Sequence, residues 1–271
     1  TAYRRQRQMC IRDSCPLAPE FQQIVKREWL SLPALRAADG YLNNDPNHRD
    51  KTFFCFDGKH GHRAGEATAN GVLKLDCEIA EAVKADGAKA ALGFGFLDSQ
   101  QAFYDGYSLN ASEGEWAKRR YLDPFTPVIA RAEVRRARRD MNQALLNRFN
   151  IAFDLNFHGS QLKDYPHIAE YGRRIKALRE RYAAELWNAE FVERQGAQVN
   201  GPDLSYSVFA GRNGKRAVVV VNMGTERASK AEVTLPGASA MAYASPEDPA
   251  QKTFGGSVEI APQSAVVIFE K

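Results

Sequence analysis

Two hydrophobic patterns alternate along the first two thirds of the chain. Apolar positions at helix-like spacing predict helices over residues 21–35, 72–85, 135–149 and 166–187. Continuous apolar runs lie between them and predict buried strands over residues 38–45, 90–98, 104–109, 126–131 and 150–157. This alternation of strand and helix favours a parallel α/β sheet with both faces covered.

After Asn188 the pattern changes to short strands separated by turn residues. The stretch 206–223 predicts a strand, a turn and a second strand, because Asn213-Gly214 is a strong hairpin signal. Further short strands are expected at residues 231–237, 240–245, 256–262 and 264–270. Together they predict an all-β sandwich of about 70–80 residues.

The ends of the early strands carry acidic and amide side chains, which is typical of barrel strands whose carboxyl ends hold the active site. The expected fold class is therefore α/β: the C-terminal part of a (β/α)8 (TIM) barrel, followed by a small all-β sandwich. The expected organisation is a tail over residues 1–15, a partial barrel over 16–188 and the sandwich over 189–271.

Composition excludes several classes of protein. The chain has 271 residues, of which 44% are apolar and 26% charged, so a large core is expected and global disorder is excluded. No stretch approaches the ~18 uninterrupted apolar residues of a membrane-spanning helix. We therefore expect no membrane partner.

The basic character of the chain is concentrated at its start. Residues 1–15 hold four arginines and one aspartate, which account for three of the four net positive charges. The string RRQRQMCIRDS resembles a translated sequencing-adapter remnant, and a genuine basic tail is the alternative. Without this segment, charge no longer points to a nucleic-acid partner. The true N-terminus is expected to be missing, so localisation stays open and a secreted or periplasmic protein fits.

No cofactor is predicted. Cys10 and Cys15 fall in the segment 1–15 that resembles an adapter remnant. Cys55 and Cys77 have neither metal-ligand spacing nor a disulfide framework. LGFGF (92–96) lacks the third glycine of a dinucleotide-binding loop.

Glycosidic bond cleavage needs two carboxylates, one to protonate the leaving oxygen and one to attack the sugar or activate water. The sequence predicts Asp98 as the acid and Asp45 as the nucleophile or base, each at the end of a predicted strand. The alternative is structural: Asp45-Pro46 starts a loop, and Asp98 caps the following helix.

Further side chains are candidates for substrate binding. In the loop after residues 53–56 we expect Asp57, His60, His62 and Arg63 to contact sugar hydroxyls or a sugar carboxylate, with a metal site and a purely structural loop as alternatives. The remaining candidates are two carboxylates and two aromatic side chains that suit sugar faces: Asp105, Tyr107, Trp116 and Asp154.

Two stretches near the end of the predicted barrel resemble a known family. RRIKALRERYAAELWNAEF (173–191), followed by YSVFAGRNGKRAVVVVNMG (206–224), resembles the barrel–sandwich junction of amylase- and α-galactosidase-like glycoside hydrolases. Upstream, ADGYLNND (38–45), CFDGKHGHRAGEA (55–67) and ALGFGFLD (91–98) resemble bacterial glycosidase-like barrels. The resemblance implies that 38–45 is about the fourth barrel strand and 150–157 the eighth, with the first half absent.

The family pattern places carboxylates where this chain has Asn43 or Asn44 and Phe94. Two hypotheses therefore remain. The leading one is a glycoside hydrolase with a carboxylate pair at the barrel rim and a carbohydrate substrate. The alternative is a non-catalytic carbohydrate-binding or degenerate relative. The sequence does not indicate the sugar, the stereochemical outcome or the oligomeric state.

Overall fold

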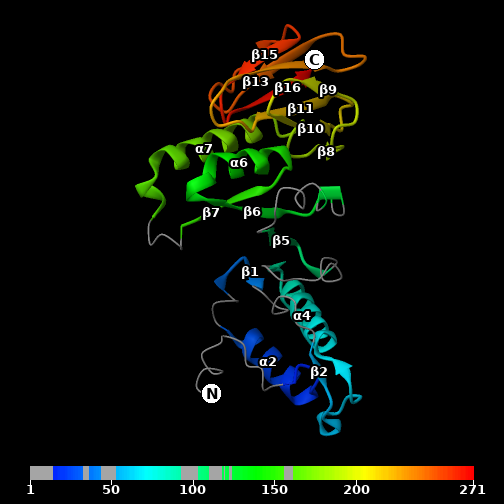
Figure 1. The fold of residues 1–271 in the computed structure, drawn as a ribbon. Helices are drawn as coiled ribbons and strands as arrows, with labels where there is room; N and C mark the ends of the chain where they lie inside the picture. The colour runs from blue at the N-terminus through cyan, green and yellow to red at the C-terminus, as the bar shows by residue number, and fades with distance from the viewer. Residues whose placement is uncertain are drawn as a thin grey trace. The chain divides into compact units, whose positions relative to one another are not determined.

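The computed structural model describes residues 15–32, 37–43, 53–92, 103–109, 118, 120–121, 124–155 and 161–271. The chain divides into two compact units, residues 1–108 and 109–271. Figure 1 shows the elements of both.

The first unit contains two helices, α2 (Pro19–Ser31) and α4 (Thr68–Ala85). Its parallel strands are β1 (Gly40–Asn43), β4 (Lys89–Leu92) and β5 (Gly106–Leu109), with β4 paired to both of the others. A small hairpin lies between β1 and α4 in the chain, and its parts are β2 (Phe54–Cys55), the 3-10 turn η1 (Gly58–His60) and β3 (Glu66–Ala67).

The predicted helices of this unit are confirmed, and their apolar faces pack together. Leu75, Ile79 and Val83 of α4 form a buried cluster. Phe21, Val25 and Trp29 of α2 pack against it. Helix α2 ends at Ser31 because Leu32 is extended (φ −63°, ψ 121°), the conformation favoured before a proline.

The second unit begins with a parallel strand pair and two helices. The pair is β6 (Val128–Glu133) and β7 (Asn150–Asp154). The helical elements are η3 (Val134–Arg136), α6 (Ala137–Leu146), η5 (Leu162–Asp164) and α7 (Pro166–Arg181).

From Glu190 onwards the elements are strands in two sheets. The six-stranded sheet has the order β14-β13-β16-β11-β10-β8, and the three-stranded sheet has the order β15-β12-β9. Their bounds are β8 (Glu190–Phe191), β9 (Gln198–Asn200), β10 (Leu204–Ala210), β11 (Arg216–Asn222), β12 (Ser229–Thr234), β13 (Met241–Ala244), β14 (Lys252–Thr253), β15 (Ser257–Ile260) and β16 (Ala265–Glu270). The predicted hairpin at Asn213-Gly214 joins β10 to β11, and Gly214 adopts φ +77°.

Both faces of the six-stranded sheet are covered. Val219 and Val221 of β11 pack in one cluster with α6 and α7, whereas Val218 and Val220 pack against the three-stranded sheet. The mixed α/β and all-β organisation is thus confirmed, although the described parallel strands do not close into a barrel. The predicted domain border after residue 188 stays a prediction.

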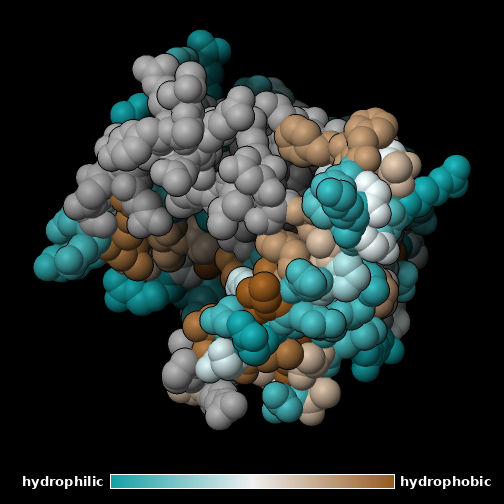
Figure 2. All heavy atoms as spheres, turned by 90° about the horizontal axis from the view of Figure 1, so that it is seen from below, coloured by the Kyte–Doolittle hydropathy of each residue, from teal (hydrophilic) through white to brown (hydrophobic). Residues whose placement is uncertain are grey.

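On the face that Figure 2 shows, hydrophilic and apolar side chains lie side by side among the described residues. Among the large apolar side chains that the structure describes, Phe56 has the highest exposed fraction, 77%. Within the described residues, no helix has the length and apolar character required to span a bilayer.

A buried arginine joins α7 to the strand layer. Arg179 is 9% exposed and donates to the carbonyl oxygens of Phe149 (2.8 Å) and Ala144 (2.6 Å). Burial, together with the charge of Arg120, lowers the pKa of Arg179 to about 9. The Ala144 carbonyl also accepts from the Phe149 N–H at 2.8 Å, so loss of Arg179 removes two charge-assisted hydrogen bonds from a buried site and leaves Ala144 one partner.

We predict that Arg179→Met lowers the free energy of unfolding by about 2–4 kcal/mol, since methionine fills similar space without donating. Arg173→Met is the matched control, because Arg173 lies on the same helix with a side chain that is 69% exposed. It should change stability by less than about 0.5 kcal/mol in the same denaturant titration. Equal effects of the two variants would contradict a structural role for Arg179.

Candidate functional site

The carboxyl ends of β6 and β7 carry ionisable side chains on one face. Val128, Ala130 and Ala132 are buried in β6, so the alternate positions Arg131 and Glu133 project from the opposite face. Glu133 is paired in register with Asp154, which places both carboxylates on this face. Arg131 Nη1 lies 3.5 Å from Asp154 Oδ2, and the Asp154 side chain is only 8% exposed.

A third carboxylate supports the end of β6 from α6. Asp140 Oδ2 accepts a hydrogen bond from the backbone N–H of Glu133 at 3.0 Å. Asp140 is buried, and burial raises the pKa of its carboxyl above the usual value. This edge therefore combines a cation with carboxylates in different environments, which suits recognition of polar groups.

In the first unit, the neighbouring parallel strands β1 and β4 end together, because Asn43 is paired with Leu92. Asn43 Nδ2 donates to Asp76 Oδ1 at 3.1 Å and lies 3.4 Å from the Tyr104 hydroxyl. Burial raises the pKa of Tyr41 to about 12 and also raises that of Tyr104. The partly buried Asn43 amide thus hydrogen-bonds to two buried side chains, Asp76 and Tyr104.

The predicted catalytic pair Asp45 and Asp98 lies outside the described residues, as does Trp116. Asp105 precedes β5, at the amino end of the strand, and accepts a hydrogen bond from the Ala90 N–H at 2.9 Å. Tyr107 lies within β5 and is 1% exposed. Of the predicted residues, Asp154 is therefore the one described at a strand carboxyl end.

The predicted sugar-binding loop is closely engaged within the first unit. Asp57 caps η1 by accepting from the Lys59 N–H at 2.9 Å, and its Oδ2 lies 3.2 Å from His60 Nε2. His62 Nδ1 lies 2.9 Å from the Arg63 carbonyl oxygen, while the Arg63 side chain is exposed.

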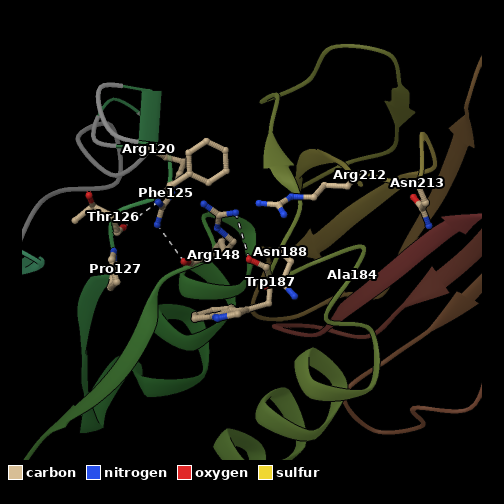
Figure 3. Close-up of a pocket in the computed structure, with 10 residues that line it drawn as sticks. All are labelled: Arg120, Phe125, Thr126, Pro127, Arg148, Ala184, Trp187, Asn188, Arg212 and Asn213. Atoms are coloured by element: carbon tan, nitrogen blue, oxygen red, sulfur yellow. Dashed lines mark hydrogen bonds between the residues drawn. The ribbon is translucent and has the colours of Figure 1, made fainter.

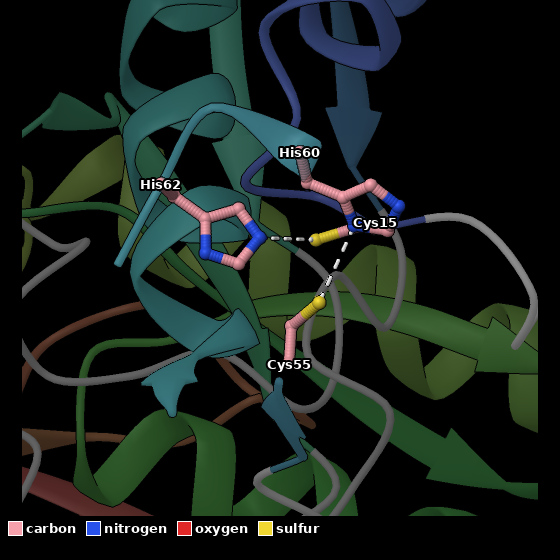
Figure 4. Close-up of side chains that lie close together, drawn as sticks. All are labelled: Cys15, Cys55, His60 and His62. Atoms are coloured by element: carbon pink, nitrogen blue, oxygen red, sulfur yellow. Dashed lines mark hydrogen bonds between the residues drawn. The ribbon is translucent and has the colours of Figure 1, made fainter. Parts of the chain in front are cut away.

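One ring nitrogen of each histidine, Nδ1 of His60 and Nε2 of His62, faces a cysteine sulfur atom (Figure 4). Cys55 Sγ lies 3.3 Å from His60 Nδ1, and Cys15 Sγ lies 3.2 Å from His62 Nε2. The sequence did not predict this group, because Cys15 belongs to the segment 1–15 that resembles an adapter remnant. The spacing of the two histidines alone is a weak signal. The signal that the sequence does contain is Cys55, followed five positions later by His60-Gly61-His62.

A cavity of about 700 Å³ lies in the second unit (Figure 3). Its lining includes Trp187, Phe125 and the guanidinium groups of Arg120, Arg148 and Arg212. It borders the amino ends of β6 and β7, since Pro127 lies one position before β6 and Arg148 two positions before β7. Ligands of parallel α/β sheets bind at the carboxyl ends, so this cavity is not on the edge expected for catalysis.

No protein-family model matches the chain, and no curated protein matches it. Among solved structures, it is similar to the ligand-free cyclic alpha-maltosyl-(1→6)-maltose hydrolase from Arthrobacter globiformis, with a TM-score of 0.52 and 14% identity over 93% of this chain and 61% of that one. A GH27 β-L-arabinopyranosidase from Geobacillus stearothermophilus gives a TM-score of 0.45 and 11% identity over 73% of this chain and 53% of that one. The chain thus spans 53 to 61% of the length of these two proteins. The likeness to the maltosyl-maltose hydrolase shows a shared fold.

We predict that Asp140→Asn gains stability relative to the wild type as pH is raised from 4 to 7. A raised carboxyl pKa means that the folded state holds a proton that the unfolded state has released, so the wild type loses stability as pH rises through this window. Asparagine keeps the acceptor for the Glu133 N–H without the ionisation.

Denaturant titrations at several pH values measure this difference. Glu180→Gln on α7 is the control, because its side chain is 63% exposed. A constant difference between Asp140→Asn and the wild type across the pH range would contradict the prediction.

Proposed function

We propose that this chain belongs to a glycoside-hydrolase-like protein that acts on a carbohydrate, and that its parallel strands are the C-terminal part of a (β/α)8 barrel. The fold shared with the maltosyl-maltose hydrolase supports this proposal. The order of the elements supports it as well, because the parallel strands are followed by a β-sandwich. α-Glucosidic oligosaccharides are accordingly the first substrates to test.

One observation carries the catalytic part of the proposal: β1 and β4 are adjacent and parallel, with Asn43 opposite Leu92. Their carboxyl ends therefore lie at one edge of the sheet. In the sequence, Asp45 comes two positions after Asn43, and Asp98 comes six positions after Leu92. We propose that these two carboxylates, which follow neighbouring strand ends, form the pair that glycosidic cleavage requires.

In this mechanism, Asp98 protonates the leaving glycosidic oxygen. Asp45 attacks the anomeric carbon or activates a water molecule. Arg63, whose side chain is exposed, is the proposed substrate contact of the first unit. We also propose that Asp154, paired with Arg131, accepts from a sugar hydroxyl and that Trp116 stacks on a sugar face. Asp57, His60, His62, Asp105 and Tyr107 have partners or burial within the first unit, so their direct contact with sugar has less support.

A second candidate function is carbohydrate binding without cleavage. The Asn43 amide favours it, because a partly buried amide that is hydrogen-bonded to Asp76 stands here where the family pattern has a carboxylate. The two functions share a ligand and differ in turnover.

We predict that the full chain hydrolyses at least one member of a panel of aryl α- and β-glycosides and maltooligosaccharides. Asp45→Asn and Asp98→Asn should each lower kcat by about 10²–10⁴-fold, because each removes a proton-transfer or nucleophilic group. Calorimetric titration with the same sugars should show that both variants still bind.

Glu232→Gln is the matched control, since this exposed carboxylate lies on β12 of the sandwich. It should leave kcat unchanged. Binding without turnover in the wild type would establish the second candidate function. Absence of both binding and turnover across the panel would contradict the proposal as a whole.

A further inference from the structure

Four potential metal ligands gather in the first unit, and none of them belongs to the strands β1 and β4. One ligand atom from each of Cys15, Cys55, His60 and His62 lies within 4.8 Å of every other. Figure 4 shows the sulfur atoms of Cys15 and Cys55 between the two imidazole rings. We propose that these four side chains bind a zinc ion.

The distances suit a four-coordinate ion. Zinc–nitrogen bonds of about 2.0–2.1 Å and zinc–sulfur bonds of about 2.3 Å place tetrahedral ligands roughly 3.3–3.8 Å apart. The two sulfur–nitrogen distances, 3.3 Å for Cys55 to His60 and 3.2 Å for Cys15 to His62, are close to this range. All four ligand atoms lie within 4.8 Å of one another, so side-chain movements of up to about 1 Å bring the remaining pairs into the tetrahedral range.

Each histidine is also oriented by a second oxygen partner. His60 Nε2 lies 3.2 Å from the Asp57 carboxylate, and His62 Nδ1 lies 2.9 Å from the Arg63 carbonyl oxygen. An N–H donated to each oxygen leaves the other ring nitrogen, the one facing sulfur, with its lone pair. This is the outer arrangement that metal-ligating histidines almost always have, and it fixes the tautomer that binds metal.

The backbone around the ligands is held in place. The Asp57 cap and the positive φ of Gly61 (+73°) bring His60 and His62 to one side of the hairpin. The turn that begins at Cys15 is closed by the Ala18 N–H on the Cys15 carbonyl at 3.0 Å. A Cβ added to Gly71 of α4 would meet the Pro16 carbonyl oxygen at 2.4 Å, so the turn is seated directly on this helix.

The charge of the four ligands favours a divalent ion. Two thiolates and two neutral imidazoles carry two negative charges, which a divalent ion neutralises at a partly buried site. Mixed sulfur and nitrogen donors in a closed set of four are typical of structural zinc. The ion joins the turn at Cys15 to a loop 47 positions further along the chain, and this predicts a stabilising role.

The test uses the full chain, purified without a histidine tag and under reducing conditions. Metal analysis by mass spectrometry should find one zinc per chain, and cobalt substitution should give the absorption bands of tetrahedral thiolate coordination. EDTA should lower the midpoint of thermal unfolding. Cys15→Ser and Cys55→Ser should lose stoichiometric zinc.

Cys77→Ser is the matched control, because Cys77 is a free cysteine on α4 outside the cluster and should keep one zinc. Asp57→Asn preserves all four ligands and should weaken zinc binding about 10–100-fold, which separates a metal site from a folding defect. The proposal is overturned if the reduced wild type binds no zinc at neutral pH, if zinc persists in both serine variants, or if Cys15 and Cys55 form a disulfide in reduced buffer. These measurements do not depend on any glycosidase activity.

Discussion

The second unit depends on one constraint: its six-stranded sheet must bury both faces. Residues 218–221 of β11 are four consecutive valines without exposed surface, and they alternate between two hydrophobic clusters. One cluster contains Met141 and Leu145 of α6 together with Ile175 and Leu178 of α7. These helices are therefore held between the sheet and the strand pair β6–β7, and they are apolar on more than one side.

This constraint determines where polar chemistry can lie in the second unit. Because α6 and α7 cover one face of β6 and β7, ionisable side chains project from the other face, where Arg131, Glu133 and Asp154 are found. Asp140 is the exception, since it lies on a helix and supports the end of β6 through a backbone hydrogen bond. The arrangement provides a polar strand edge on an apolar support, and active sites of α/β barrels lie at such strand ends, which is why the proposed function is placed there.

Much of the fold could be predicted from local pattern, and much of the site could not. Helices α4 and α7 and the hairpin β10–β11 followed from apolar spacing and from Asn213-Gly214, because these signals lie within one element. Strands β8, β9 and β14 have two or three residues, too few to produce a period. Asp105 was expected at a strand end, and it lies just before β5, at the amino end of that strand. The order of residues alone does not tell the amino end from the carboxyl end of a strand that has only four residues. The Cys15 cluster was missed because its ligands come from distant segments, and only folding brings them together.

The two proposals rest on different side chains: one concerns the carboxyl ends of the parallel strands, and the other concerns the turn at Cys15 and the β2–β3 hairpin of the first unit. The central claim is that a saccharide binds at the carboxyl ends of the parallel strands. Backbone amide NMR of the full chain, titrated with maltooligosaccharides, tests it most directly. We expect saturable shifts at Glu133, Asp154 and their neighbours, with Trp187 and the sandwich strands unaffected. Shifts confined to the cavity around Trp187, or no shifts with any sugar, would contradict it.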